Sequence, residues 1–343
     1  MRKFLFLILY IIFISLSSLL QAKRIIVFQE AWQHPIISDI DGNHFFIYEL
    51  KSCNIWMCNR LSNEKYNLKK IGNGKGEGPF EFKWINHVKS FKGFIFVNSG
   101  DKISYFYRDG SPKEEKKTPY DASTYLPVGN NFVCKKYYST VKQRTISIKA
   151  LNSNLEVKKN LMETQFQNYY NSTNNKQNFV VIRDFFEYKV EKERIYVGNT
   201  QKGFHFSVFD ADGNKQYEIN RHYEKCLITS KHKQEELDEL LRMVGKARYN
   251  RALKKYNLLY PEYFPAYSNF SVSDGKIYIL TYPKINGKQE MLVLNGKGDL
   301  IKKVKEVPTG QYSEPFCVYR GKYYYLNDNA ETEKWEIHEI EID

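Results

Sequence analysis

Short runs of alternating apolar and polar residues, joined in pairs by tight turns, recur along the sequence from about residue 36 onward. Alternation with a period of two is typical of strands that bury one face. Dipeptides such as Asp-Gly and Lys-Gly between two such runs predict hairpins, because Gly and Asn tolerate the positive φ of tight turns. Six copies of this hairpin are present, at residues 36–48, 85–97, 125–134, 186–197, 270–280 and 316–326.

A second hairpin follows nearly every copy, so that each unit is a four-stranded meander. Such units arranged around an axis are the blades of a β-propeller. The sixth unit, which ends with residues 335–342, lacks one strand, and an unused apolar run at residues 24–28 precedes the first unit. Pairing these two segments would close the ring and hide both exposed sheet edges. We therefore predict an all-β, six-bladed β-propeller over residues 23–343, closed by an N-terminal strand.

One segment between the fourth and fifth blades does not fit a strand. Leu237, Leu240, Leu241 and Val244 follow a spacing of three and four, which predicts a helix. Thr229 or Ser230 is suited to cap its start, and Gly245 is expected to divide it in two. We predict a helical insertion at residues 231–257 that covers one face of the disc, with a lid or docking helix as the alternative. Its second half is basic, with candidate binding residues Arg242, Lys246, Arg248 and Arg251.

A glycine-rich segment at residues 71–82 connects the first and second blades. Its backbone amides are candidates for holding an anion, but the segment lacks the Lys-Ser/Thr ending of a P-loop and does not open a helix. We therefore interpret it as an inter-blade turn with Lys75 and Glu77 as candidate binding residues. The residues expected to shape the turn are Gly74, Gly76, Gly78, Pro79 and Phe82.

Residues 74–82, Gly-Lys-Gly-Glu-Gly-Pro-Phe-Glu-Phe, resemble the Gly-x-Gly-x-Gly-Pro-x-x-Phe signature of exported bacterial six-bladed propellers of the NHL/TolB-like type. Residues 260–267, Tyr-Pro-Glu-Tyr-Phe-Pro-Ala-Tyr, resemble a segment that precedes a blade in the same family. The resemblance implies the six-bladed ring and export. It implies no single activity, because propellers carry many functions.

The first 22 residues have the order of a secretory signal peptide. Arg2 and Lys3 are followed by an apolar stretch over residues 4–20, and Ala22 supplies a small residue at the expected cleavage point. We predict a signal peptide at residues 1–22 and a periplasmic or cell-surface location. An uncleaved leader that anchors the chain in the membrane is the alternative, because the apolar stretch is near the lower length limit for a membrane span.

Composition adds two points. The 27 Tyr and 23 Phe favour strands, whose half-buried surfaces suit aromatic side chains. The net charge of +13 would attract anionic partners. The basic residues are scattered and export argues against a nucleic-acid partner, so we expect none. A protein, a peptide or an anionic glycan stays open as the partner.

Catalytic and metal motifs are not recognisable. The seven histidines form no H-x-H or H-E-x-x-H pattern, no G-x-S-x-G elbow is present, and Asp-x-Asp-Gly-Asn at residues 39–43 and 210–214 is better explained by turns than by calcium binding. The five cysteines are odd in number, and Cys53 and Cys58 would bridge a hairpin if oxidised. We expect no cofactor and assign no catalytic or metal-ligating residue.

These observations favour a non-catalytic binding or scaffold propeller outside the cytoplasm. It would recognise a protein, peptide or glycan through the face that carries the connections between blades. The alternative is a metal-dependent propeller enzyme, resembling a lyase or lactonase, with its site in the central channel. A third hypothesis is an anchored subunit of an envelope complex, if the leader is retained.

Overall fold

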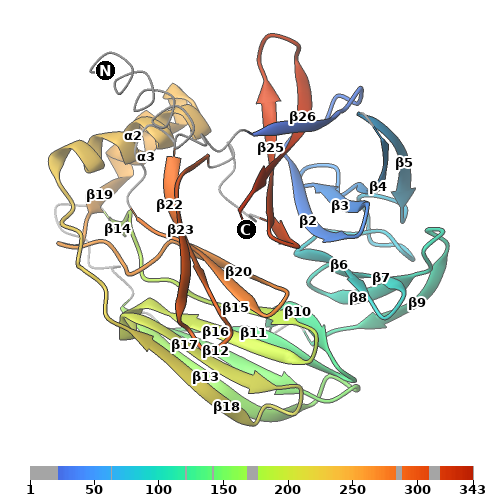
Figure 1. Cartoon of the computed structure of the whole chain (residues 1–343), viewed down its shortest axis with the longest axis horizontal. Coiled ribbons are helices and arrows are strands. Elements are labelled where there is room, and N and C mark those ends of the chain that lie inside the picture. Colours follow the sequence, from blue (N-terminus) through green and yellow to red (C-terminus); the bar gives the residue numbers. More distant parts are fainter. Residues whose placement is uncertain are drawn as a thin grey trace, which may run out of the picture.

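The chain folds into six four-stranded antiparallel sheets arranged around an axis (Figure 1). The computed structural model describes residues 22–62, 64–119, 122–140, 143–167, 177–282, 288–308 and 317–342. The predicted six-bladed propeller is therefore confirmed. The predicted signal peptide lies outside the described residues, except for Ala22.

Five of the sheets are each continuous in sequence. The first contains β2 (Pro35–Asp41), β3 (His44–Glu49), β4 (Ile55–Ser62) and β5 (Lys65–Ile71). The second contains β6 (His87–Phe91), β7 (Phe94–Asn98), β8 (Lys102–Phe106) and β9 (Pro112–Lys117). The third contains β10 (Ala122–Val128), β11 (Asn131–Ser139), β12 (Gln143–Leu151) and β13 (Val157–Gln167). The fourth contains β15 (Phe186–Glu191), β16 (Arg194–Asn199), β17 (Phe204–Asp210) and β18 (Lys215–Arg221), with the short helix η1 (Thr200–Lys202) between β16 and β17. The fifth contains β20 (Asn269–Ser273), β21 (Lys276–Leu280), β22 (Lys288–Leu294) and β23 (Leu300–Pro308).

The sixth sheet joins the two ends of the described chain. Its strands are β24 (Cys317–Tyr319), β25 (Lys322–Asn329), β26 (Lys334–Glu341) and β1 (Lys23–Val27). Ile26 lies opposite Ile337, and the amide of Phe28 donates to the carbonyl oxygen of Trp335 at 2.9 Å. The predicted closure by an N-terminal strand is confirmed.

Each pair of neighbouring sheets buries an apolar layer, because the alternating side chains of one sheet pack against those of the next. Between the third and fourth sheets, Val133, Ile148, Ile195 and Val197 are all fully buried. Sheets packed face to face in this way remove apolar surface from water, and this burial is the main stabilising contribution to the fold.

Two helices and a small extra sheet depart from the repeat. Helices α2 (Ser230–Val244) and α3 (Lys246–Lys255) lie between β18 and β20, and Gly245 separates them at φ 76°. Thr229 caps α2 by accepting from the amide of His232, whose ring in turn accepts from the amide of Thr229. Strand β19 (Tyr256–Leu259) follows α3 directly and pairs in parallel with β14 (Gln177–Val180), which lies between β13 and β15. The parallel pair was not predicted.

The outermost strand of one sheet ends, and the innermost strand of the next sheet begins, on the same side of the disc. Four antiparallel strands return the chain to the side on which it entered each sheet. The glycine-rich loop, the helical insertion and the β14–β19 pair are all in connections between these strands. We call this side the inter-blade face.

Candidate functional site

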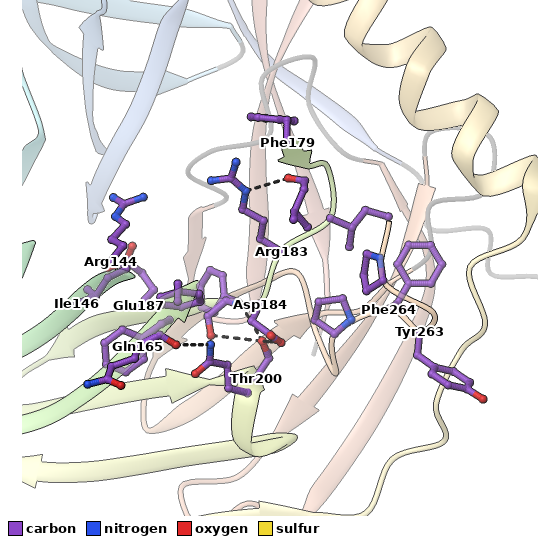
Figure 2. A pocket seen from close by; sticks show the side chains of 18 of the residues that line it. Arg144, Ile146, Gln165, Phe179, Arg183, Asp184, Glu187, Thr200, Tyr263 and Phe264 are labelled. Carbon is purple, nitrogen blue, oxygen red and sulfur yellow. Dashed lines mark hydrogen bonds between the residues drawn. The ribbon is translucent and has the colours of Figure 1, made fainter. Parts of the chain in front are cut away.

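A pocket of about 1100 Å³ opens on the inter-blade face above the third and fourth sheets (Figure 2). Its walls come from several separate segments of the chain. These segments are residues 135–140 of β11 and just beyond it, residues 144–146 of β12, residues 165–166 of β13, residues 178–187 around β14 and β15, residues 200–201 of η1, and residues 223–225 and 256–265 on either side of the helices. The β14–β19 pair therefore forms part of the wall of this pocket.

A partly buried ion pair lies in the wall of the pocket. The Nζ of Lys135 donates to Oε2 of Glu187 at 2.6 Å, and the Lys135 side chain is only 9% exposed. Burial by itself lowers the pKa of Lys135, but the negative charge of Glu187 and the contact with Tyr137 outweigh it, so the net pKa is raised. Because lysine stays charged here, Glu187 is neutralised by a partner from the neighbouring sheet.

Two arginines also line the pocket, and each is held by an aromatic ring. The guanidinium carbon of Arg144 lies 4.4 Å from the ring centroid of Tyr137. That of Arg183 lies 4.7 Å from the ring centroid of Phe179, and its Nε donates to the carbonyl oxygen of Val180 at 2.9 Å. Figure 2 shows both guanidinium groups on the same side of the pocket. Stacking on rings is a common way to hold Arg side chains at binding sites.

The second carboxylate of the wall, Asp184 before β15, is engaged by η1. The hydroxyl of Thr200 donates to Oδ1 of Asp184 at 3.0 Å and accepts from the amide of Phe185 at 2.6 Å. The neighbouring Gln201 donates from Nε2 to the carbonyl oxygen of Gln165 at 3.1 Å and accepts from the hydroxyl of Thr164. These contacts fix η1 against β13 and leave the side chain of Gln165 exposed to solvent.

The rim of the pocket is aromatic. Phe179 is 39% exposed and Tyr263 is 37% exposed. Phe264 is buried between His232 of α2 and Tyr282, at centroid distances of 5.1 and 5.0 Å. The rim is thereby anchored to the start of the helical insertion.

The glycine-rich loop lies elsewhere on the inter-blade face and forms a closed turn. The amide of Phe82 donates to the carbonyl oxygen of Gly74 at 2.8 Å, and the ring of Phe82 is fully buried. The carboxylate of Glu81 accepts from the amide of Gly78 at 2.8 Å. A Cβ on Gly76 would come within 2.0 Å of the same carboxylate, which accounts for the glycine. Pro79 offers its carbonyl oxygen to the side chain of Asn73 at 3.0 Å.

The predicted binding residues are not brought together in this pocket. Lys75 and Glu77 lie in the glycine-rich loop, where Glu77 pairs with Lys83 at 3.1 Å. The four basic residues of the insertion are all exposed on the helices and none lines the pocket. They are Arg242, Lys246, Arg248 and Arg251.

The described part of the chain contains no set of side chains arranged to bind a metal ion. No group of three His, Cys, Asp or Glu side chains is placed there to hold a metal ion. His87 at the start of β6 is held neutral, since burial together with the charges of Lys89 and Lys189 lowers its pKa to about 3. Within the described residues no helix is both long and apolar enough to cross a bilayer.

The pocket residues carried only weak signals in the sequence. Lys135 to Tyr138 interleave basic and aromatic residues, and residues 260–267 were singled out as a segment before a blade. Arg144 and Arg183 stand in stretches without a motif. Their proximity depends on how the third and fourth sheets are placed side by side.

Comparisons with known proteins show the fold. No family model and no curated protein matches the sequence. Among solved structures, a Bacteroides fragilis protein that is provisionally described as exported matches with a TM-score of 0.56 at 13% identity, covering 94% of this chain and 95% of that one. Weaker likenesses include the AfRom2 CNH domain, at 10% identity, TM-score 0.38 and coverage of 94% and 98%. A luciferin-regenerating enzyme matches at 9% identity, TM-score 0.38 and coverage of 93% and 92%.

The chain thus belongs to the structural class of six-bladed β-propellers. The Bacteroides fragilis protein shares this architecture over nearly its whole length.

Proposed function

We propose that this chain is an exported, non-catalytic binding propeller that takes a ligand into the pocket on its inter-blade face. The observation that carries the proposal is the convergence of several separate segments on one pocket with an aromatic rim. Concave sites with apolar walls and a few placed polar groups are typical of ligand binding. The ligand would be a protein segment, a peptide or a glycan.

The chemistry of the wall supports binding more than catalysis. Acid–base catalysis needs a group whose proton is free to move at the reacting atom. Glu187 is held by Lys135 and Asp184 by Thr200. The described lining residues include neither histidine nor cysteine.

Export and membership of the NHL/TolB-like type are part of the same proposal. Support for export comes from the charged, apolar and small-residue order of residues 1–22. Support for the family comes from residues 74–82, whose glycines close the turn described above. N-terminal sequencing of the protein recovered from the producing cell tests export, because a chain that still begins at Met1 contradicts cleavage.

Binding is tested by filling the pocket. Gln165→Trp on β13 places an indole in the pocket, while Val157→Trp adds the same group at the other end of β13, where Val157 is already 59% exposed. Both variants and the unaltered protein are applied to arrays of glycans and peptides. We expect the unaltered protein and Val157→Trp to share their ligands, and Gln165→Trp to lose them. Undiminished binding by Gln165→Trp would rule out this pocket as the site.

A further inference from the structure

The two arginines of the pocket carry positive charge that no carboxylate of the described chain neutralises. Neither Arg144 nor Arg183 has a carboxylate oxygen within 4.0 Å among the described residues, although three acidic residues line the same pocket. Glu187 pairs with Lys135, Asp184 accepts from Thr200, and the negative charge of Glu262 acts on the adjacent Tyr263, whose pKa it raises. The acidic groups are thus engaged with partners other than the two guanidinium groups.

The two guanidinium groups also act on each other. Burial lowers the pKa of Arg183, and the positive charge of Arg144 lowers it further. Arg183 is nevertheless an exposed residue, and like charges near each other repel. Their rings and the carbonyl of Val180 hold both side chains in place. An anion bound between them would relieve the repulsion.

Guanidinium groups recognise planar oxyanions, because their paired N–H donors match the two oxygens of a carboxylate. The rest of the pocket lining offers hydroxyl and amide groups on Ser139, Gln165 and Asn178, and the partly exposed rings of Tyr256 and Tyr263. A sugar ring presents the same combination, with hydroxyls at its edge and C–H groups on its face. A peptide that adds a strand to a sheet binds through backbone hydrogen bonds to an open strand edge, whereas side chains provide the groups described above.

We propose that Arg144 and Arg183 bind the carboxylate of a uronic-acid residue, and that the pocket takes an acidic oligosaccharide. This inference rests on the proposed binding function and names its ligand class. The volume of about 1100 Å³ slightly exceeds the range of about 300–1000 Å³ for small-molecule sites, so more than one sugar ring fits.

The test uses calorimetry with tetrameric galacturonate, mannuronate and guluronate, each beside its fully methyl-esterified form. The unaltered protein is expected to bind at least one uronate, and its ester roughly tenfold or more weakly, because a charge-assisted hydrogen bond is lost. Arg144→Gln and Arg183→Gln should each weaken uronate binding by a similar factor. Arg194→Gln, at the exposed start of β16 and outside the pocket lining, is the matched control and should leave binding unchanged.

Thermal melts of each variant show whether it is folded. The variant Arg183→Lys separates the contribution of the positive charge to binding from that of the arrangement of N–H donors. Lysine keeps the charge but not the fork of donors, so its affinity should lie between those of arginine and glutamine. Three results overturn the inference: no uronate binds, the esters bind equally well, or hexaglutamate binds more tightly than every uronate. A different result would contradict this inference alone. If a ligand from the arrays no longer binds Gln165→Trp but still binds Arg144→Gln and Arg183→Gln, the proposed function stands and the uronate inference is wrong.

Discussion

The indole N–H of Trp335 donates a hydrogen bond of 3.0 Å to the carbonyl oxygen of Trp32, and so links the end of the propeller to its beginning. Beside this contact, the ring of Phe28 lies 4.2 Å from that of Trp32. The N-terminal segment is therefore packed into the last sheet through side chains as well as through the strand β1.

Ile26→Ala should destabilise the whole propeller. Ile26 and its partner Ile337 are both fully buried, and deleting such a side chain leaves a cavity that costs about 2–5 kcal/mol. Urea unfolding followed by fluorescence measures the loss. Ile301→Ala, the matched change at a side chain that is 52% exposed, should stay within about 0.5 kcal/mol of the unaltered protein. Equal effects of the two substitutions would contradict a closed ring.

The closing sheet should lose stability in acid through Glu336. Burial alone raises the pKa of Glu336, but the hydrogen bonds from His338 at 2.8 Å and Asn329 at 3.0 Å, with the charge of Arg24, outweigh it and lower the net pKa. Because the folded pKa is below the ordinary value of 4.5, this carboxylate stabilises the fold above about pH 4.5. Its contribution is lost as the pH falls through the folded pKa.

Glu336→Gln tests this sign. The variant should be less stable by about 1–3 kcal/mol at pH 7, because the amide of glutamine replaces a buried carboxylate that accepts hydrogen bonds. Its free energy of unfolding should fall less steeply between pH 5 and 3. Urea midpoints across that range provide the measurement. Glu341→Gln on the same strand is the control, since its side chain is 65% exposed. A slope in Glu336→Gln equal to that of the unaltered protein would show that another group titrates.

Gly198→Ala should destabilise the fourth sheet by overpacking. A Cβ at Gly198 would lie 2.6 Å from the hydroxyl oxygen of Tyr267, which donates to the carbonyl of His205 at 3.0 Å. Forcing an extra methyl into such a core costs about 1–3 kcal/mol. In a double-mutant cycle, Tyr267→Phe should recover part of the loss, because it removes the clashing atom. Additive losses in the double variant would contradict the clash.

Native thiol labelling should report Cys226 alone. The structure has Cys53 and Cys58 as free thiols in different apolar clusters, so it does not contain the disulfide considered from the sequence. Burial raises the pKa of Cys58 and Cys317 to about 12, which suppresses the reactive thiolate. Cys226 is partly exposed. Cys226→Ser should abolish labelling of the native protein by a disulfide reagent. The unaltered protein, denatured without a reductant, should show five reactive thiols.

The sequence was sufficient for the fold because its signals are local. Each hairpin combines period-two alternation with its own turn residues, and Gly275 and Gly321 lie at positive φ where the turns were predicted. The division of the helical insertion at Gly245 follows from the same backbone property. The closure was predictable because the sixth unit lacks one strand in the sequence, and the apolar run at residues 24–28 belongs to no other unit.

The pocket was not predictable for the opposite reason. Arg144 and Arg183 are brought together by the packing of two sheets, and no local pattern records which side chains meet there. The strands β14 and β19 are four residues each and pair in parallel across 79 positions of sequence. Short apolar runs of this kind do not distinguish a strand from a loop. The basic charge of the insertion predicted Arg248 and Arg251 as binding residues, but both lie on the exposed surface of α3 and outside the pocket.

Strand β19 begins at Tyr256, the residue directly after the end of α3, and Tyr256 belongs to the wall of the pocket. Its neighbour on β14, Phe179, holds the guanidinium of Arg183. A macromolecule that docked on the basic helix and shifted its axis would therefore move the ring that holds this arginine. By thermodynamic reciprocity, occupancy of one location would then alter affinity at the other.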